Sequence, residues 1–200
     1  MKKKYILSLA SLLILSGFLI IDHSKTKQKP SKKIVVQHGF LAHFSKNDLV
    51  NNATAIISGT VISSEVQNDF LGLPATDFKI KVNKVFRGEV NDEIEVRTVG
   101  GETDDTIHIA DKQAVTFEIG EDVTLFLIDE KGVRPDKDDF DYFVLGQHQG
   151  KFKKKEGKIK SKRDTFSEKD FLKELGKIEK ENAKNKLPKL YVKPGEGDNI

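Results

Sequence analysis

Two stretches of alternating hydrophobic and polar residues, 76–86 and 93–99, form the clearest pattern in the chain. Alternation with a period of two is typical of half-buried β-strands, so each stretch predicts one strand. The phase of the first stretch breaks near Asn83-Lys84, which predicts a β-bulge there. Arg87-Gly88 ends this strand, and the two strands are expected to pair as a hairpin at the middle of a small β-barrel.

The outward positions of this hairpin carry charges of both signs: Asp77, Lys79, Lys81, Glu93, Glu95 and Arg97. Mixed charges on alternate positions are typical of a sheet face that water covers. We therefore expect these six side chains to be solvated, and we do not place a binding site on them.

Further strands are expected on both sides of the hairpin. Residues 53–66 predict a long first strand, and Val115, Phe117 and Ile119 alternate again after a longer connection. Residues 123–128 are apolar at almost every position, which is typical of a strand buried on both faces. Tyr142 to Leu145 predicts another buried strand.

A last hairpin is expected around the turn at Glu156-Gly157. Its apolar side is thin, because only Phe152 and Ile159 lie on it. We therefore expect this hairpin to be peripheral and exposed.

Two helices are predicted, each beginning after a serine. Ser45 precedes a short helix over residues 45–53 and is a favoured N-cap residue, with Asp48 in the first turn. Ser167 is the expected N-cap of a longer helix, and Asp170 follows at the spacing of a capping box. One face of this helix is an apolar stripe, which makes it amphipathic: Phe171, Leu172, Leu175 and Ile178.

These elements predict a mainly β protein with one folded domain, flanked by segments of other kinds. The expected organisation, by residue range, is a signal or transmembrane anchor at 1–21, a linker at 22–44, a β-barrel domain at 45–166, a C-terminal helix at 167–182 and a disordered tail at 183–200.

The first segment begins with the basic residues of MKKKY and continues in an apolar run from Ile6 to Ile21. This arrangement predicts export with a cytoplasmic N-terminus. The run is just short of the roughly 17–25 residues of a spanning helix. Small residues at Leu15-Ser16-Gly17 would suit cleavage, although the apolar run continues beyond them. We favour an anchor through residues 5–21, hence a single-pass protein of the cell membrane, over a secreted one.

Composition and charge narrow the function. Cysteine is absent, which excludes disulfides, zinc–thiolate sites and a cysteine nucleophile. Residues 34–150 carry 10 Lys and Arg against 21 Asp and Glu, a net charge of −11, whereas 1–33 and 151–200 are each +7. An acidic centre argues against nucleic acid as a partner. The basic flanks would suit anionic lipid or a cell-wall polymer.

Two resemblances bear on fold and location. Leu15-Ser16-Gly17-Phe18 resembles the lipobox of bacterial lipoproteins, with Phe18 in the place of the lipidated cysteine. Residues 50–150 resemble uncharacterised exported proteins of Firmicutes and, more distantly, the OB-like barrel of netrin and metalloproteinase-inhibitor modules. This second likeness is carried by Gly59-Thr60-Val61, the pattern from Val82 to Gly88, Gly100-Gly101 and the run from Val123 to Leu127.

The second resemblance implies an OB-like barrel, a fold that binds ligands on one sheet face and its flanking loops. Inhibition of a protease by the route of that family is excluded, because it needs cysteines that this chain lacks.

The candidate binding residues lie in two polar segments, because long connections with polar clusters often carry function. They contain Glu102, Asp104, Asp105 and His108 in the first, and Asp136, Asp138, Asp139 and Asp141 in the second. We expect a non-enzymatic module that binds an envelope protein or a cell-wall polymer, without cofactor or metal. The alternative is a metal-assisted hydrolase that uses the acidic loops 102–108 and 129–141. No serine-hydrolase, phosphate-loop or zinc-protease motif supports an enzyme.

Overall fold

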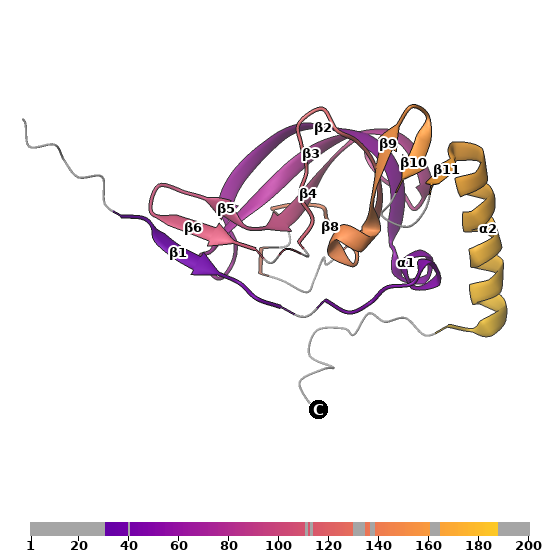
Figure 1. Cartoon of the computed structure of the whole chain (residues 1–200), viewed down its shortest axis with the longest axis horizontal. Helices are drawn as coiled ribbons and strands as arrows, with labels where there is room; N and C mark the ends of the chain where they lie inside the picture. Colours follow the sequence, from indigo (N-terminus) through magenta and orange to yellow (C-terminus); the bar gives the residue numbers. More distant parts are fainter. Residues whose placement is uncertain are drawn as a thin grey trace, which may run out of the picture. The chain divides into compact units, whose positions relative to one another are not determined.

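The computed structural model describes residues 31–187, apart from 40, 111, 113, 130–134, 137–138 and 161–164. This part of the chain is mainly β with two α-helices, as the sequence predicts (Figure 1). The predicted signal or anchor at 1–21 lies outside the described residues. Within them, no helix combines the length and apolarity needed to cross a membrane.

Eleven strands and three helical segments make up the described chain. The strands are β1 (Lys33–Val36), β2 (Ala55–Asn68), β3 (Pro74–Arg87), β4 (Glu93–Val99), β5 (Gly101–Glu102), β6 (Thr106–Ile109), β7 (Asp122–Ile128), β8 (Tyr142–Val144), β9 (Lys151–Lys155), β10 (Lys158–Lys160) and β11 (Thr165–Ser167). The helices are α1 (Lys46–Asn52), the 3₁₀-helix η1 (Gln147–Gly150) and α2 (Glu168–Asn185).

Eight strands form one sheet in the order β11-β10-β9-β7-β2-β3-β4-β8. The short β8 also pairs with β7, so β7, β2, β3, β4 and β8 make a closed circuit of hydrogen-bonded neighbours. Two residue pairs join β8 to each of its neighbours, and β4–β8 is the parallel contact. Because β9, β10 and β11 extend the sheet beyond β7, it is not a clean barrel.

The long β2–β3 pair contains the predicted bulge. Ser58 pairs with Lys84 and Gly59 with Val82, so Asn83 is an extra residue on β3. Gly59 lies where the strands approach closely: a Cβ there would stand 2.6 Å from Ile80 Cγ2 and 2.7 Å from the Lys81 carbonyl oxygen. Only glycine fits this position.

A first apolar cluster fills the inside of the five-stranded circuit. Its members come from β2, β3, β4, β7 and β8, with Val115 from the connection before β7. Residues 115–118 are not a strand, which corrects the prediction from their alternation. Val115 is nevertheless buried, and Phe117 packs on Phe78 with ring centroids 5.0 Å apart. The alternation therefore marks burial without the hydrogen bonds of a strand.

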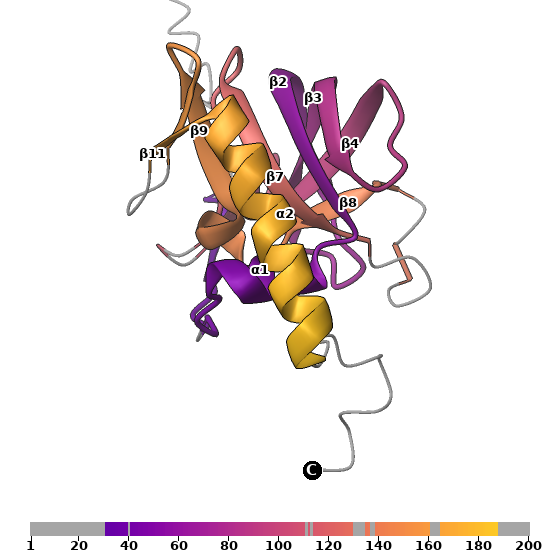
Figure 2. The same ribbon diagram turned by 90° about the vertical axis from the view of Figure 1, so that its right-hand side faces the viewer.

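A second apolar cluster lies between the other side of the sheet and the two α-helices (Figure 2). Phe126 of β7 and Phe171 of α2 meet there, with ring centroids 6.2 Å apart. Because β7 contributes to both clusters, it is buried on both faces, as predicted. Phe152 and Ile159 are also buried, which corrects the expected exposure of the hairpin for its apolar side, whereas Lys153 and residues 155–158 are exposed as expected.

The helices begin where the sequence predicts, but α2 continues to Asn185, three residues into the segment predicted as a disordered tail, and residues 188–200 of that segment lie outside the described residues. Ser45 and Asp48 form a reciprocal capping box, and the Ser167 side chain accepts a hydrogen bond from the Asp170 backbone N–H. The stripe of α2 is buried except for Leu172, which is 41% exposed. Leu172 is not a member of the second apolar cluster, which α2 joins through Phe171, Leu175 and Ile178.

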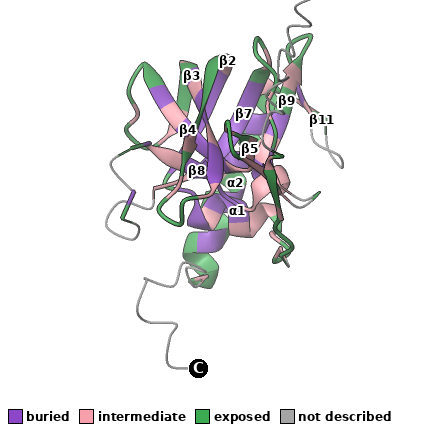
Figure 3. Cartoon of the chain, turned by 90° about the vertical axis from the view of Figure 1, so that its left-hand side faces the viewer, coloured by how far each residue is buried: buried purple, intermediate pink, exposed green. Residues whose placement is uncertain are grey.

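A separate three-stranded sheet has the order β1-β6-β5, with β1 parallel to β6. It uses Lys33–Val36 from the segment predicted as a linker and two short stretches of the longer connection predicted before Val115. Figure 1 shows this sheet and α2 at opposite ends of the described domain, and Figure 3 shows exposed residues on it.

Candidate functional site

The first predicted polar segment does not form a cluster of acid and base. Glu102 accepts a hydrogen bond from Lys32 Nζ at 2.6 Å, while Asp104 is exposed. Asp105 accepts from Thr103 Oγ1 at 2.8 Å, and this hydrogen bond lowers the pKa of the exposed carboxyl. His108 is buried, with Nδ1 2.8 Å from the Pro74 carbonyl oxygen and Nε2 3.1 Å from Gln37 Oε1. It therefore connects β6 to the start of β3.

The second predicted segment lies against the sheet. Asp141 makes two contacts with Glu95 of β4: its Oδ2 accepts from the Glu95 N–H, and its own N–H donates to the Glu95 carbonyl, both at 2.9 Å. Asp139 is exposed, and its N–H donates to the Asp136 carbonyl. Asp136 is buried, and Asp138 lies outside the described residues.

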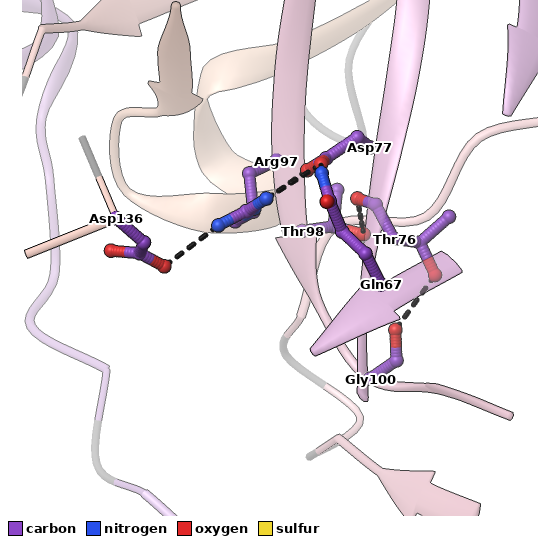
Figure 4. A network of polar contacts seen from close by, with 7 residues as sticks. All are labelled: Gln67, Thr76, Asp77, Arg97, Thr98, Gly100 and Asp136. Atoms are coloured by element: carbon purple, nitrogen blue, oxygen red, sulfur yellow. Dashed lines mark hydrogen bonds and ion pairs between the residues drawn. The ribbon is translucent and has the colours of Figure 1, made fainter. Parts of the chain in front are cut away.

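Asp136 belongs to a buried network of charges around Arg97 (Figure 4). Arg97 donates from Nε and Nη2 to the two carboxylate oxygens of Asp77, each at 2.7 Å, and from Nη1 to Asp136 Oδ2 at 2.7 Å. Exposed fractions of the side chains are 1% for Arg97, 5% for Asp77 and 6% for Asp136. We call these three residues the arginine network.

Neighbouring side chains complete the arginine network. The Arg97 guanidinium carbon lies 4.3 Å from the centroid of the Phe140 ring, close enough for a cation–π contact. Gln67 of β2 donates a hydrogen bond to Asp77 Oδ2. The network thus joins β2, β3 and β4 to the segment that precedes β8.

This burial corrects the expectation that Asp77 and Arg97 lie on a solvated face. Both side chains do point outward from the circuit, but Asp136 and Phe140 pack over them. Burial by itself lowers the pKa of Arg97, yet the hydrogen bonds and charges of Asp77 and Asp136 outweigh it and raise the pKa. A guanidinium that stays charged cannot exchange protons, so the network is suited to positioning rather than to acid–base catalysis.

The two predicted segments approach the same end of β3 without forming one site. His108 contacts Pro74, and the arginine network includes Asp77 a little further along the strand. Among the described residues, no group of three or more His, Asp or Glu side chains is arranged to hold a metal ion.

The turn between β2 and β3 was not among the predicted binding segments, but its side chains and backbone set it apart. Phe70 is 45% exposed and Leu71 is 67% exposed. Asp69 Oδ1 accepts hydrogen bonds from the N–H groups of Leu71 and Leu73, at 2.9 and 3.0 Å. The Gly72 N–H donates to the Asp69 carbonyl, and Gly72 has a φ of +74°. The turn therefore presents two apolar side chains on a backbone with its own hydrogen bonds.

The signal for this turn was an apolar pair, Phe70-Leu71, between the turn-forming residues Asp69 and Gly72. We call residues 69–73 the hairpin tip.

Comparison with known proteins adds no family to these observations. A scan against protein-family models found no match, and a search of curated proteins found none either. The function of the chain therefore has to follow from the contacts, burial and charges of its described residues.

Proposed function

We propose that this protein is an exported, membrane-associated binding module without enzymatic activity, and that the hairpin tip belongs to its binding surface. The observation that carries the proposal is the exposure of Phe70 and Leu71 on a turn that Asp69 holds in place. Exposed apolar side chains on an ordered turn favour contact with a partner, since burial on binding removes them from water.

The strand order supports an OB-like interpretation of the five-stranded circuit. OB folds are partly open five-stranded barrels that bind ligands on one sheet face and on the loops beside it. In this chain the corresponding face is that of β3 and β4, the hairpin tip precedes β3, and residues 129–141 precede β8. The arginine network would then hold one of the two flanking loops against the face.

A metal-assisted hydrolase has less support. Asp136 is engaged by Arg97, and Asp141 is engaged by the Glu95 backbone, so these two candidate ligands already have partners. The first polar segment adds no ligand to them through the contacts described, since His108 binds Pro74 and Gln37 and Glu102 binds Lys32.

The chemistry of the surface suits a protein or a cell-wall polymer with an apolar face. The hairpin tip offers an aromatic ring and an aliphatic chain, while Lys79 and Glu95 on the neighbouring strands offer charges of both signs. The acidic centre disfavours nucleic acid. Anchoring through residues 5–21, with a cytoplasmic N-terminus, would keep the module at the cell membrane; cleavage would release it as a secreted protein.

The test compares three proteins in binding to envelope extract and to purified cell-wall polymer. They are the wild type, the double variant Phe70→Ser/Leu71→Ser, and Ile119→Ser, which changes an apolar residue that is 58% exposed elsewhere. We expect the double variant to lose the bound partner while Ile119→Ser keeps it. All three should melt at similar temperatures, because the changed side chains are exposed. Equal binding by all three, or binding by none, would reject the proposed surface.

A further inference from the structure

The small sheet has an apolar face that is open to solvent. In the parallel register of β1 and β6, Ile34 pairs with Ile107 and Val36 with Ile109, so these four side chains lie on one face. The exposed fractions are 62% for Ile34, 50% for Val36 and 46% for Ile109. We call these four residues the β1–β6 face.

The other side of the same sheet is occupied. His108 is buried there and contacts the carbonyl oxygen of Pro74, which joins the small sheet to β3. The inner side of the small sheet packs on the domain. The β1–β6 face is therefore the outer side of a sheet that is already packed on its inner side. β-Branched apolar residues gathered on one outward sheet face are a candidate contact surface.

We propose that the β1–β6 face rests on the surface of a lipid bilayer. The inference depends on the proposed anchoring of the chain through residues 5–21. Eleven residues, 22–32, separate the end of the apolar run from Lys33 at the start of β1. A chain of this length spans about 40 Å at most when fully extended. An anchored chain therefore keeps β1 within about 40 Å of the end of the membrane-spanning run.

The sequence that leads into β1 is rich in lysine, which suits an anionic bilayer. Residues 22–33 contain one acidic residue, Asp22, and five lysines: Lys25, Lys27, Lys29, Lys32 and Lys33. Lysines near a bilayer surface are attracted to anionic headgroups, and apolar side chains beside them add burial at the interface. Lys32 is paired with Glu102, and the turn between β5 and β6 also exposes Asp104 and Asp105, so attraction to anionic headgroups has to come from the other lysines of this stretch. The aliphatic side chains of the β1–β6 face supply the apolar contribution.

The test uses the absence of cysteine, which allows one fluorescent label at a chosen position. Full-length Ile109→Cys and Ile119→Cys proteins are labelled with an environment-sensitive dye and reconstituted into vesicles of phosphatidylcholine and phosphatidylglycerol that contain nitroxide-bearing lipid. Ile109 lies on the β1–β6 face, while Ile119 is a matched exposed isoleucine outside it. We expect a blue-shifted emission and several-fold stronger nitroxide quenching at position 109 than at position 119.

Equal emission and quenching at the two positions would overturn the proposal. A blue-shifted emission at position 109 in detergent without lipid would also overturn it. If this shift grows with protein concentration, a second copy covers the face. If the shift is independent of concentration, another segment of the same chain covers it. Carbonate extraction separates this inference from the anchoring. If carbonate releases the chain from membranes, anchoring and docking both fail; if the chain stays while position 109 reports water, only the docking fails.

Discussion

Two neighbouring rows of charged residues on the same face of β3 and β4 have opposite environments. Asp77 pairs with Arg97 in the strand register, and Lys79 pairs with Glu95 in the next outward row. The first pair is buried, with contacts of 2.7 Å, whereas the side chains of the second are 43% and 42% exposed and 3.8 Å apart. The two rows look alike in sequence, so the strand pattern alone does not determine burial.

The difference comes from the segment before β8, which covers only the first row. Asp136 supplies a second carboxylate to Arg97, and Phe140 supplies an aromatic ring. Breaking a buried ion pair leaves a charge without water or partner, whereas an exposed pair exchanges its partner for water at little cost.

Arg97→Met should have the largest effect, a loss of about 3–5 kcal/mol in the free energy of unfolding. The substitution keeps an apolar chain of similar length but leaves Asp77 and Asp136 buried without their shared cation. Urea denaturation measures the loss. A change below about 1 kcal/mol, the range of an exposed pair, would contradict the buried character of this row.

A combined variant serves as the control for Arg97→Met. Replacing Asp77 and Asp136 by Leu in the Arg97→Met background removes the two unpaired carboxylates. Apolar replacements of whole buried ion pairs are often neutral, so much of the lost stability should return.

Asp136→Asn should have a smaller effect, a loss of about 1–3 kcal/mol, because the bidentate contact between Arg97 and Asp77 is kept. The matched control is Asp139→Asn, which changes an exposed carboxylate in the same segment and should stay within about 0.5 kcal/mol. Chemical denaturation of both variants checks the prediction. Equal stabilities would show that Asp136 does not hold this segment on the sheet.

The ion pair between Glu121 and Lys151 is intermediate in burial between the two rows of β3 and β4. Its side chain is 9% exposed, and its Oε2 accepts a hydrogen bond from Lys151 Nζ at 2.6 Å. Burial by itself raises the pKa of Glu121, but the hydrogen bonds from Lys151 and Lys153 outweigh it, so the pKa is lowered. Burial also lowers the pKa of Lys151 despite this contact, which indicates that the net gain from the pair is modest.

A carboxyl with a lowered pKa stabilises the fold above its unfolded pKa and loses this contribution as the pH falls through the folded value. Glu121→Gln should therefore cost about 1 kcal/mol at neutral pH. The difference in free energy of unfolding between this variant and the wild type should close as the pH falls below about 4.5, the pKa of this carboxyl in the unfolded chain. Urea unfolding across this range measures it, with Glu118→Gln, an exposed neighbour, as the control. A gap that stays constant with pH would contradict the assignment.

Features set by local sequence could be predicted. The Ser45 capping box, the bulge at Asn83 and the double burial of β7 depend on neighbouring residues or on the run of apolar side chains. The burial of Phe152 could not be predicted from its own strand, because α2, distant in sequence, covers it. The burial of Phe152 therefore depends on packing between segments distant in sequence, which its local pattern does not determine.

The candidate site shows the same limit. Asp136 and Asp141 were among the predicted residues, but their partners Arg97 and Glu95 both lie on β4, 39 and 46 residues earlier in the chain. Nothing in the acidic spacing distinguishes them from the exposed Asp139. The hairpin tip is different, because Phe70 and Leu71 stand between turn residues, and an apolar pair in such a place is a local signal.

Lys79→Met should have the smallest effect, between 0 and about 1 kcal/mol. Its ammonium lies 3.8 Å from Glu95 Oε1, and both side chains are exposed, so water replaces the contact when it is lost. Any effect should decline as salt is added, because ions screen exposed charges. The effect of Arg97→Met should change little with salt, since its partners are buried. Urea titrations of both variants at low and high salt measure this difference, and an equal salt dependence would remove the distinction between the two rows.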